Sequence, residues 1–222
     1  EALRDVCKRC RKAVSVCFCA TIQRFDSDPV FAILLHPKES KKRIGTGRLT
    51  HLTLKNSFLI EGVTFSENTQ IQSLLEDERY FPVVLYPGSN AIDVGTEEGV
   101  RGLHQRIPPN KKLMVFVIDG TWFCAKKMLR VNHWLQSLPK IAFTPVNTSI
   151  YQIRKQPKEF YVSTIEAVQF VIDAWAHTDR RETVVHSALM DSFRFLITTQ
   201  LKNVATPNQK AVRGNRKTTK PP

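Results

Sequence analysis

The segment KLMVFVIDGTW, residues 112–122, joins six consecutive apolar residues to a short polar motif. An apolar run of this length, bounded by Lys112 and an Asp-Gly pair, predicts a strand that is buried on both faces, as in a parallel sheet. The motif Asp119–Trp122 (DGTW) then lies at the carboxyl end of the strand, where open α/β sheets keep their ligand crevice. Because Asp-Gly is also a common turn pair, the segment alone is equally consistent with a simple turn followed by a core tryptophan.

Further apolar runs alternate with helical patterns along the chain, which predicts an α/β fold with a mainly parallel sheet flanked by helices. We expect Pro37 to end the first strand in a loop. The expected strands are residues 30–35, 57–63, 81–86, 113–118, 141–143 and 160–162, and the expected helices are residues 40–56, 68–78, 122–138, 165–177 and 182–201, with a weak helix before Pro108. We expect a cysteine-containing element over residues 1–25, a catalytic domain over 26–204 and a basic, disordered tail over 205–222.

The chain is strongly basic, with 33 Lys and Arg against 20 Asp and Glu and a net charge of +13. Residues 208–222 contain several cations and no acid, but the remainder is basic too. This excess predicts salt-sensitive binding to a polyanion. Nucleic acid fits better than an acidic membrane, since no predicted helix combines a lysine face with a broad apolar face. No apolar run approaches the ~20 residues of a membrane span and the N-terminus does not resemble a signal peptide, so we expect a cytoplasmic protein.

Four of the five cysteines are close together in the sequence, as C-x2-C-x6-C-x-C. Thiolates at this spacing can converge on one tetrahedral ion, and the spacing is too tight for two relaxed disulfides. All-sulfur ligation favours zinc in a structural role. The alternative is a set of small, incidentally buried cysteines. The expected ligands are Cys7, Cys10, Cys17 and Cys19.

Polar or small residues follow three of the expected strands: His36–Glu39 (HPKE), Leu85–Gly88 (LYPG) and Asp119–Trp122. A fourth motif, Ser163–Ala167 (STIEA), opens an expected helix. Its Ser-x-x-Glu spacing is that of a capping box, and the same helix N-terminus can also hold a ligand carboxylate. The chain has no GxGxxG, P-loop, HExxH or GxSxG pattern, which argues against the ordinary dinucleotide, NTP, zinc-protease and serine-hydrolase classes.

Together with Thr46–Leu49 (TGRL), these motifs resemble the DTW-domain family. The resemblance covers residues 7–201 and depends on six motifs in the family's order. It implies a tRNA-uridine aminocarboxypropyltransferase with a knotted, SPOUT-like sheet. Such an enzyme transfers the 3-amino-3-carboxypropyl group of S-adenosylmethionine to N3 of a tRNA uridine and releases methylthioadenosine. The expected partners are therefore tRNA and S-adenosylmethionine, with structural zinc and no obligate protein partner.

The chemistry of this reaction suggests roles for the motifs. A sulfonium and an ammonium favour a nearby carboxylate or aromatic face, and loss of the uridine N3 proton needs a base or an electropositive pocket. Asp119 is the candidate catalytic residue, either as that base or as a group that positions the donor, with Glu166 and His36 as further candidate bases. The residues expected to bind S-adenosylmethionine are Leu85, Tyr86, Pro87, Gly88, Asp119, Gly120, Thr121, Trp122, Ser163, Thr164 and Glu166. Those expected to contact RNA are His36, Lys41, Lys42, Arg43 and Arg48.

Three other functions remain open at this stage. A SPOUT-type RNA methyltransferase would use the methyl carbon of the same donor and release S-adenosylhomocysteine. An rRNA-directed aminocarboxypropyltransferase would differ only in its RNA. A zinc-dependent RNA-binding protein without catalysis would explain the charge and the cysteines but not the strand-end motifs. Among tRNA sites, we favour a uridine of the variable loop over one of the D-loop.

Overall fold

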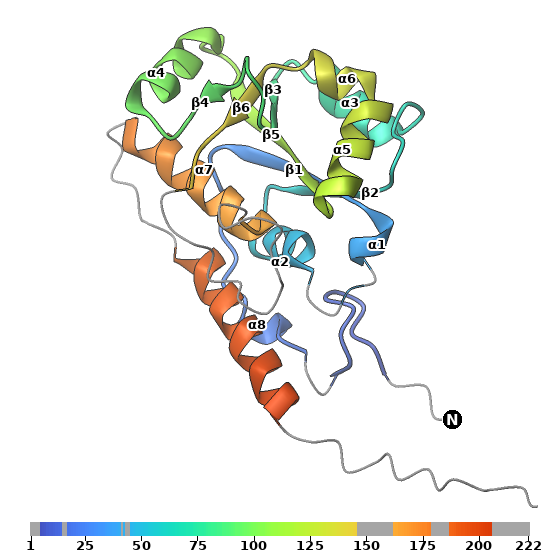
Figure 1. The fold of residues 1–222 in the computed structure, drawn as a ribbon. Helices are drawn as coiled ribbons and strands as arrows, with labels where there is room; N and C mark the ends of the chain where they lie inside the picture. The colour runs from blue at the N-terminus through green and yellow to red at the C-terminus, as the bar shows by residue number, and fades with distance from the viewer. Residues whose placement is uncertain are drawn as a thin grey trace, which may run out of the picture.

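A computed structural model describes residues 5–14, 17–40, 42, 45–145, 162–178 and 187–205 of the chain. Its strands form one six-stranded sheet in the order β2-β1-β5-β3-β6-β4, and every pair is parallel (Figure 1). The α/β class and the parallel sheet predicted from the sequence are confirmed. The strands are β1 (Val30–Leu35), β2 (Phe58–Glu61), β3 (Tyr80–Leu85), β4 (Ile92–Asp93), β5 (Lys112–Asp119) and β6 (Lys140–Ala142).

The apolar run of residues 113–118 forms most of β5, which lies in the interior of the sheet between β1 and β3. Residues 113–117 are all buried, without the alternation of a strand that faces solvent on one side. Continuous burial is expected where helices cover both faces of a parallel sheet. The carboxyl end of β5 is thereby placed between the ends of β1 and β3.

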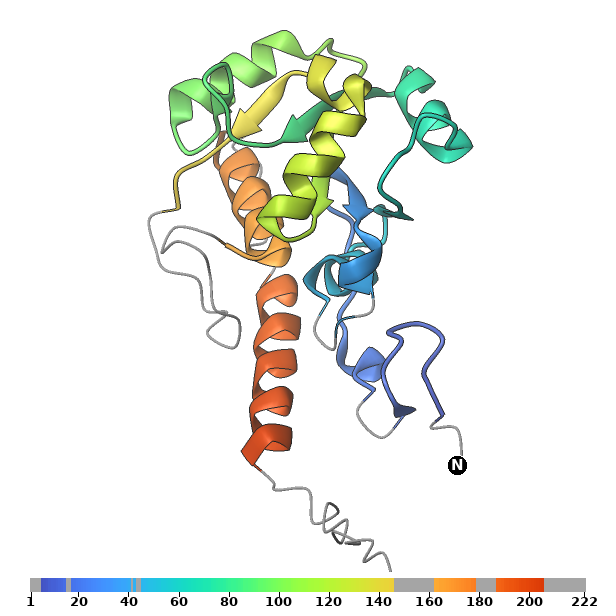
Figure 2. The ribbon, with the colours of Figure 1, turned by 45° about the vertical axis from the view of Figure 1, so that its right-hand side comes forward.

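Helices pack on both faces of the sheet and produce two hydrophobic clusters (Figures 1 and 2). One cluster contains Leu49, Leu103, Val168 and Phe193. Its helices are α2 (Thr46–Thr53), α4 (Glu97–Arg106), α7 (Thr164–Thr178) and α8 (Ala188–Ala205). The other cluster contains Ile71, Met128 and Leu135 from α3 (Thr69–Glu76), α5 (Trp122–Val131) and α6 (His133–Ser137).

Several predicted boundaries were wrong. Pro37 does not leave a loop but starts the short helix α1 (Pro37–Ser40), because proline is well suited to a first helical position. The next helix, α2, therefore begins at Thr46 rather than at residue 40. The strand β4 was not anticipated, and Val162 lies outside any strand. The rest of the expected strand 160–162 and residues 182–186 of the last expected helix lie outside the described residues, and α8 begins at Ala188.

The expected helix 122–138 is divided at Asn132 into α5 and α6. The Asn132 amide accepts a hydrogen bond from the Phe65 N–H and donates to the carbonyls of Val63 and Met128. A buried side chain that satisfies backbone groups of a distant loop stabilises the break, because those groups would otherwise be buried without partners. The loop that contains Val63 and Phe65 is more than sixty residues from Asn132 in the sequence, so the local sequence pattern could not predict this break.

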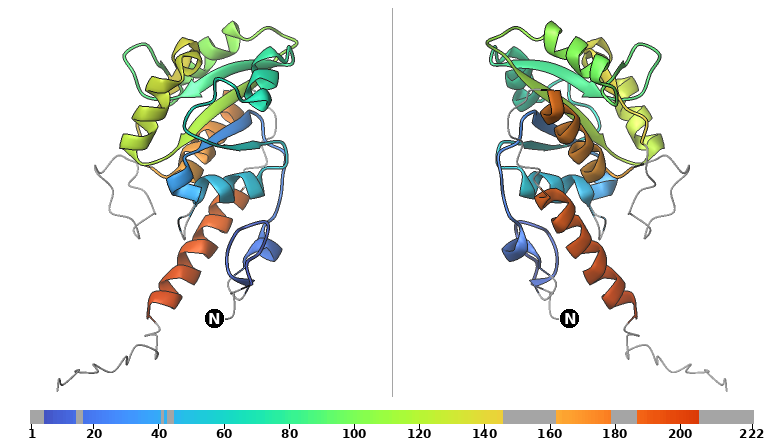
Figure 3. Two further views of the ribbon diagram at one scale, coloured as in Figure 1. Left: turned by 90° about the vertical axis from the view of Figure 1, so that its right-hand side faces the viewer. Right: turned by 90° about the vertical axis from the view of Figure 1, so that its left-hand side faces the viewer.

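The cysteine-containing element packs on the domain rather than standing apart from it (Figure 3). Cys10, Phe18 and Phe25 are buried in the same cluster as Leu49 and Phe193. The element includes the short 3-10 helix η2 (Cys19–Thr21). The division of the chain at residues 25 and 204 stays a prediction. Within the described part of the chain, no helix is long and apolar enough to cross a membrane.

Candidate functional site

The four cysteine sulfurs predicted as ligands lie within 4.8 Å of one another. Cys7 Sγ is 3.8 Å from Cys19 Sγ, and Cys10 Sγ is 3.7 Å from Cys17 Sγ. Ligands at about 2.3 Å from a tetrahedral zinc lie about 3.8 Å apart, so the sulfurs already have the spacing that zinc requires. None of the five cysteines is in a disulfide. The residues therefore fit a metal ion, and the idea of incidental cysteines is disfavoured.

The thiol pKa values of the cluster diverge. Hydrogen bonds from the Cys10 and Arg9 backbone lower the pKa of Cys7 to about 6. Burial raises the pKa of Cys19 to about 12 and also raises that of Cys10. Four thiolates this close would repel one another, so a bound cation is the means by which all four could be ionised at neutral pH.

The second candidate site is built at the carboxyl ends of β1, β5 and β3. Leu35 of β1 is paired with Asp119 of β5, and the His36 N–H donates to the Asp119 carbonyl at 2.9 Å. On the other side of β5, Leu85 is paired with Val117, so Tyr86 leaves β3 beside the same strand end. The three strand-end motifs expected to lie together are thus adjacent.

Two helices begin at the Asp119 side chain, which is buried. The hydroxyl of Thr164, the first residue of α7, donates to Asp119 Oδ1 at 2.7 Å. A Cβ added to Gly47, in the first turn of α2, would lie 2.4 Å from Asp119 Oδ2. Helix N-termini favour negative charge because their N–H groups point outward. The carboxylate therefore lies against the first turns of two helices, and a side chain at position 47 would displace it.

The rest of the DGTW motif determines how α5 leaves the strand. A Cβ on Gly120 would lie 3.2 Å from Cys124 Cβ and 3.3 Å from the Ala125 nitrogen, so glycine permits a tight turn. The Thr121 hydroxyl accepts a hydrogen bond from the Cys124 N–H at 3.3 Å and caps the helix. Gly120 and Thr121 thus have structural roles, whatever they contact in addition.

Trp122 is not the core tryptophan that a simple turn would leave, because 40% of it is exposed. Its ring stacks on Tyr86, with centroids 5.6 Å apart and an interplanar angle of 9°. Of the other predicted donor-binding residues, Leu85 is half-buried and Pro87 and Gly88 are exposed. Two motifs that are 36 positions apart in the numbering therefore form one aromatic surface beside Asp119.

The capping box predicted at the start of α7 is confirmed. Glu166 Oε2 accepts from the Ser163 N–H at 2.7 Å and from the Ser163 hydroxyl at 2.6 Å. The Glu166 carboxylate therefore stabilises the helix start that brings Thr164 to Asp119. Donor binding by these residues stays a prediction.

His36 is buried, and burial together with the charge of Lys38 lowers the pKa of its ring. Its Nδ1 accepts a hydrogen bond from the Lys38 N–H at 3.1 Å. A neutral imidazole that accepts at Nδ1 carries its proton on Nε2. His36 is therefore a hydrogen-bond donor at this strand end and is poorly suited to act as a base.

Where they are described, the cations expected to contact RNA each lie near a carboxylate of the same chain. Lys42 Nζ lies 2.5 Å from the buried Glu39 carboxylate. Arg48, with a side chain only 17% exposed, lies 3.9 Å from Glu61, which also accepts from Arg11. Lys41 and Arg43 lie outside the described residues. RNA contact by this group stays a prediction.

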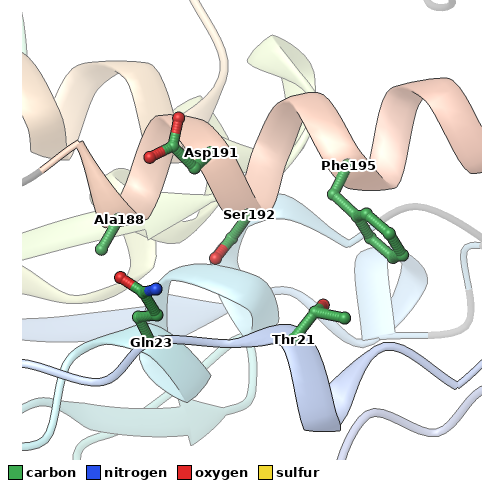
Figure 4. Close-up of a pocket in the computed structure, with 6 residues that line it drawn as sticks. All are labelled: Thr21, Gln23, Ala188, Asp191, Ser192 and Phe195. Carbon is green, nitrogen blue, oxygen red and sulfur yellow. The ribbon is translucent and has the colours of Figure 1, made fainter.

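A pocket of about 220 Å³ lies elsewhere, between residues 21–23 and the start of α8 (Figure 4). Asp191 is the one ionisable residue in its lining, and it already accepts hydrogen bonds from Ser187 and Arg194. None of the strand-end motifs reaches this pocket, so the candidate site remains at the strand ends. The pocket is lined by Thr21, Gln23, Ala188, Asp191, Ser192 and Phe195.

Comparison with known proteins gives one family and several relatives. A family model described as the DTW domain matches residues 4–201. A Drosophila melanogaster protein named tRNA-uridine aminocarboxypropyltransferase 2 is 26% identical over 190 residues, which cover 82% of this chain and 71% of the fly protein. Proteins of the same name from Macaca fascicularis and Mus musculus are 27% and 26% identical over 167 residues, which cover 73% of this chain and 54% of each relative. The chain thus spans about half the length of the two mammalian proteins. No solved structure gives a significant match.

Proposed function

Because the chain belongs to the DTW-domain family, we propose that it is a tRNA-uridine aminocarboxypropyltransferase with S-adenosylmethionine as donor substrate. The names of the fly, macaque and mouse relatives support this function. The observation that carries the proposal is the placement of Asp119 at two helix starts, beside the Tyr86–Trp122 stack. In the proposed reaction a bond forms between uridine N3 and the γ-carbon of the donor while the bond from that carbon to sulfur breaks. Methylthioadenosine leaves with the electron pair, and the N3 proton is lost to solvent.

The strand-end surface offers what the donor requires. A sulfonium and an ammonium are favoured by a carboxylate and by the faces of aromatic rings, and Asp119 and the Trp122 stack supply both. The donor has three carbons bound to sulfur, so its orientation decides which group is transferred. We place the amino-acid arm near Asp119 and the start of α7, with Leu85–Gly88 forming the neighbouring wall. The same geometry would bury the methyl group away from the uridine.

For Asp119, the contacts support positioning rather than proton removal. The Thr164 hydroxyl donates to Oδ1, and Gly47 of α2 approaches the carboxylate closely. These contacts fix the orientation of the carboxylate at the strand end. Its geometry suits an acceptor that orients the donor's ammonium group.

Loss of the N3 proton is then assisted by an electropositive setting. His36 presents an N–H donor, and the charges of Lys38, Lys127 and Lys42 lower the pKa of its ring while that of Glu39 raises it, which places three cations and one carboxylate nearby. Positive charge beside uridine lowers the pKa of N3–H, because it stabilises the uridine anion. Transfer would thus proceed without a strong protein base.

We assign structural zinc to the cysteine cluster, because a closed site with four sulfur ligands has no open position for a substrate. The SPOUT-like knot, the cytoplasmic location and RNA as the binding partner belong to the same proposal. The net charge of +13 supports RNA as the partner.

Nucleoside mass spectrometry tests the proposed function. Unmodified tRNA transcripts incubated with the protein and S-adenosylmethionine should yield a uridine that carries the aminocarboxypropyl group, together with an equal amount of methylthioadenosine. A reaction without donor and one with an rRNA transcript are the controls. Release of S-adenosylhomocysteine would instead identify a methyltransferase, and bound tRNA without any product would contradict an enzymatic role.

A further inference from the structure

The helix α5, which begins at Trp122 of the DGTW motif, presents a basic and aromatic stripe to solvent. Phe123 is 78% exposed, the most exposed of the large apolar residues in the described part of the chain. Lys126, Lys127 and Arg130 are exposed as well. Residues separated by three, four and seven positions share one face of a helix. The stripe is therefore continuous from the first turn of α5 almost to its end, and we refer to these four residues as the α5 stripe.

The composition of α5 differs from that of its neighbours. It has three cations and no carboxylate, whereas α4 contains Glu97 and Glu98 as well as two arginines. No ion pair among the described residues involves a cation of the α5 stripe. The cations Lys42 and Arg48, in contrast, are already matched by Glu39 and Glu61. An uncompensated positive stripe has a strong electrostatic attraction for a polyanion.

The position of the stripe connects it to the candidate site. Phe123 follows Trp122 directly, and Lys127 lies close enough to His36 for its charge to lower the pKa of the imidazole. Figure 2 shows α5 in front of the sheet with its start at the end of β5. From Phe123 to Arg130 the stripe spans about 10 Å along the helix axis.

We propose that the α5 stripe binds the looped RNA segment that flanks the target uridine, with one base stacked on Phe123 and phosphates on Lys126, Lys127 and Arg130. This inference rests on the proposed function. Loops suit this surface because their unstacked bases are available to aromatic side chains, whereas bases in a duplex are not. An exposed phenylalanine beside cations combines the two contacts that single-stranded RNA makes with proteins.

Fluorescence anisotropy with a labelled tRNA transcript tests the stripe by paired variants. Lys126→Ala/Lys127→Ala is compared with Arg101→Ala/Arg106→Ala on α4, which removes the same charge from exposed positions. The stripe variant should bind tRNA about tenfold more weakly. The slope of log affinity against log salt should become smaller by roughly two, because each lost phosphate contact removes up to about one from the slope. The α4 variant should change neither by more than about twofold.

The aromatic contact is tested separately. Phe123→Ala should weaken tRNA binding roughly tenfold without changing the salt slope. Phe123→Tyr should bind tRNA as well as the unmutated protein does, whereas Phe123→Leu should not.

Equal effects of the α4 and α5 pairs would overturn the proposal in favour of diffuse attraction. Full binding by Phe123→Leu would also overturn it, because an apolar contact with a protein partner would then suffice. If the unmutated protein binds no tRNA, the proposed function itself is refuted. If the unmutated protein binds tRNA and all the stripe variants bind and modify it equally well, only this inference is refuted.

Discussion

The cysteine cluster and the strand-end site are organised in opposite ways. All four ligands of the cluster come from one short segment, residues 7–19, and converge on one point. The strand-end site instead joins His36, Gly47, Tyr86, Asp119 and Thr164 from five separate elements. The first arrangement has the sulfur spacing that a metal ion requires, and the second depends on the packing of helices against a sheet. A substitution that disrupts one site should therefore leave the other site intact, so that its function can still be measured.

The two sites also balance charge differently. In the cysteine cluster the pKa of Cys7 is lowered and that of Cys19 is raised, so ionisation of all four thiols calls for a cation from outside the chain. At the strand-end site the protein itself supplies the contacts of the Asp119 carboxylate, a hydrogen bond from Thr164 and the close approach of Gly47 in α2. Metal should consequently decide the stability of the first region and have little effect on the geometry of the second.

The largest expected effect comes from Cys10→Ser, since Cys10 is the buried member of the cluster. Zinc contributes about 10–16 kcal/mol to folding in zinc-finger peptides. Loss of one ligand should remove nearly all of the bound zinc, about one equivalent in the parent protein, and lower the melting temperature. Metal analysis and thermal unfolding measure this, with Cys124→Ser as the matched cysteine control that keeps its zinc. Full zinc content in Cys10→Ser would show that the cluster is not the metal site.

The next prediction concerns Asp119→Asn, which keeps the shape of the side chain and removes its charge. We expect the transfer rate to fall at least about tenfold, or ~1.4 kcal/mol in barrier, with zinc content and melting temperature unchanged. Affinity for S-adenosylmethionine separates the possible roles. Weaker donor binding supports positioning, whereas unchanged binding with a lost rate supports a base. Transfer at the parental rate would reduce Asp119 to a turn residue.

A smaller effect is expected from Gly47→Ala, which adds one methyl group at the position 2.4 Å from Asp119 Oδ2. The carboxylate must move, so transfer should fall severalfold, because positioning errors near 1 Å already slow catalysis. Gly102→Ala is the matched control in α4, since its added Cβ would meet nothing within 4 Å. That control should be neutral in activity and slightly more stable, by up to about 1 kcal/mol. Equal activities of the two variants would mean that the contact with α2 is not functional.

The smallest effect is a dependence of stability on pH. Burial lowers the pKa values of His36 and His51 below their ordinary 6.5. Above pH 6.5 both rings are neutral in the folded and unfolded chains, so stability is fully retained. As the pH falls below 6.5 the unfolded chain takes up protons that the folded chain does not, and the free energy of unfolding decreases. Urea unfolding across this range should show the decrease, and His36→Gln/His51→Gln should reduce it. An unchanged profile in the double variant would contradict it.

Much of the fold and part of the site could be predicted because their signals are local. Burial of residues 113–117 follows from an uninterrupted apolar run, and the Ser163–Glu166 box follows from residue types three apart. The cysteine cluster was predictable for the same reason, since its ligands are too close in sequence to reach different places. Strand-end motifs could be grouped because the carboxyl ends of parallel strands meet at one edge of a sheet.

By itself, then, the sequence determined the parallel α/β class, the convergence of four cysteines and the edge of the sheet that carries the strand-end motifs. Only the tertiary structure decided that Gly47 abuts Asp119, that Trp122 stacks on Tyr86, and that Lys42 and Arg48 are matched by internal carboxylates. It also left the cations of α5 without such partners in the described part of the chain. The physical reason is range. Periodicity and spacing report on neighbours along the chain, whereas charge compensation and close contact depend on which helices and strands pack together.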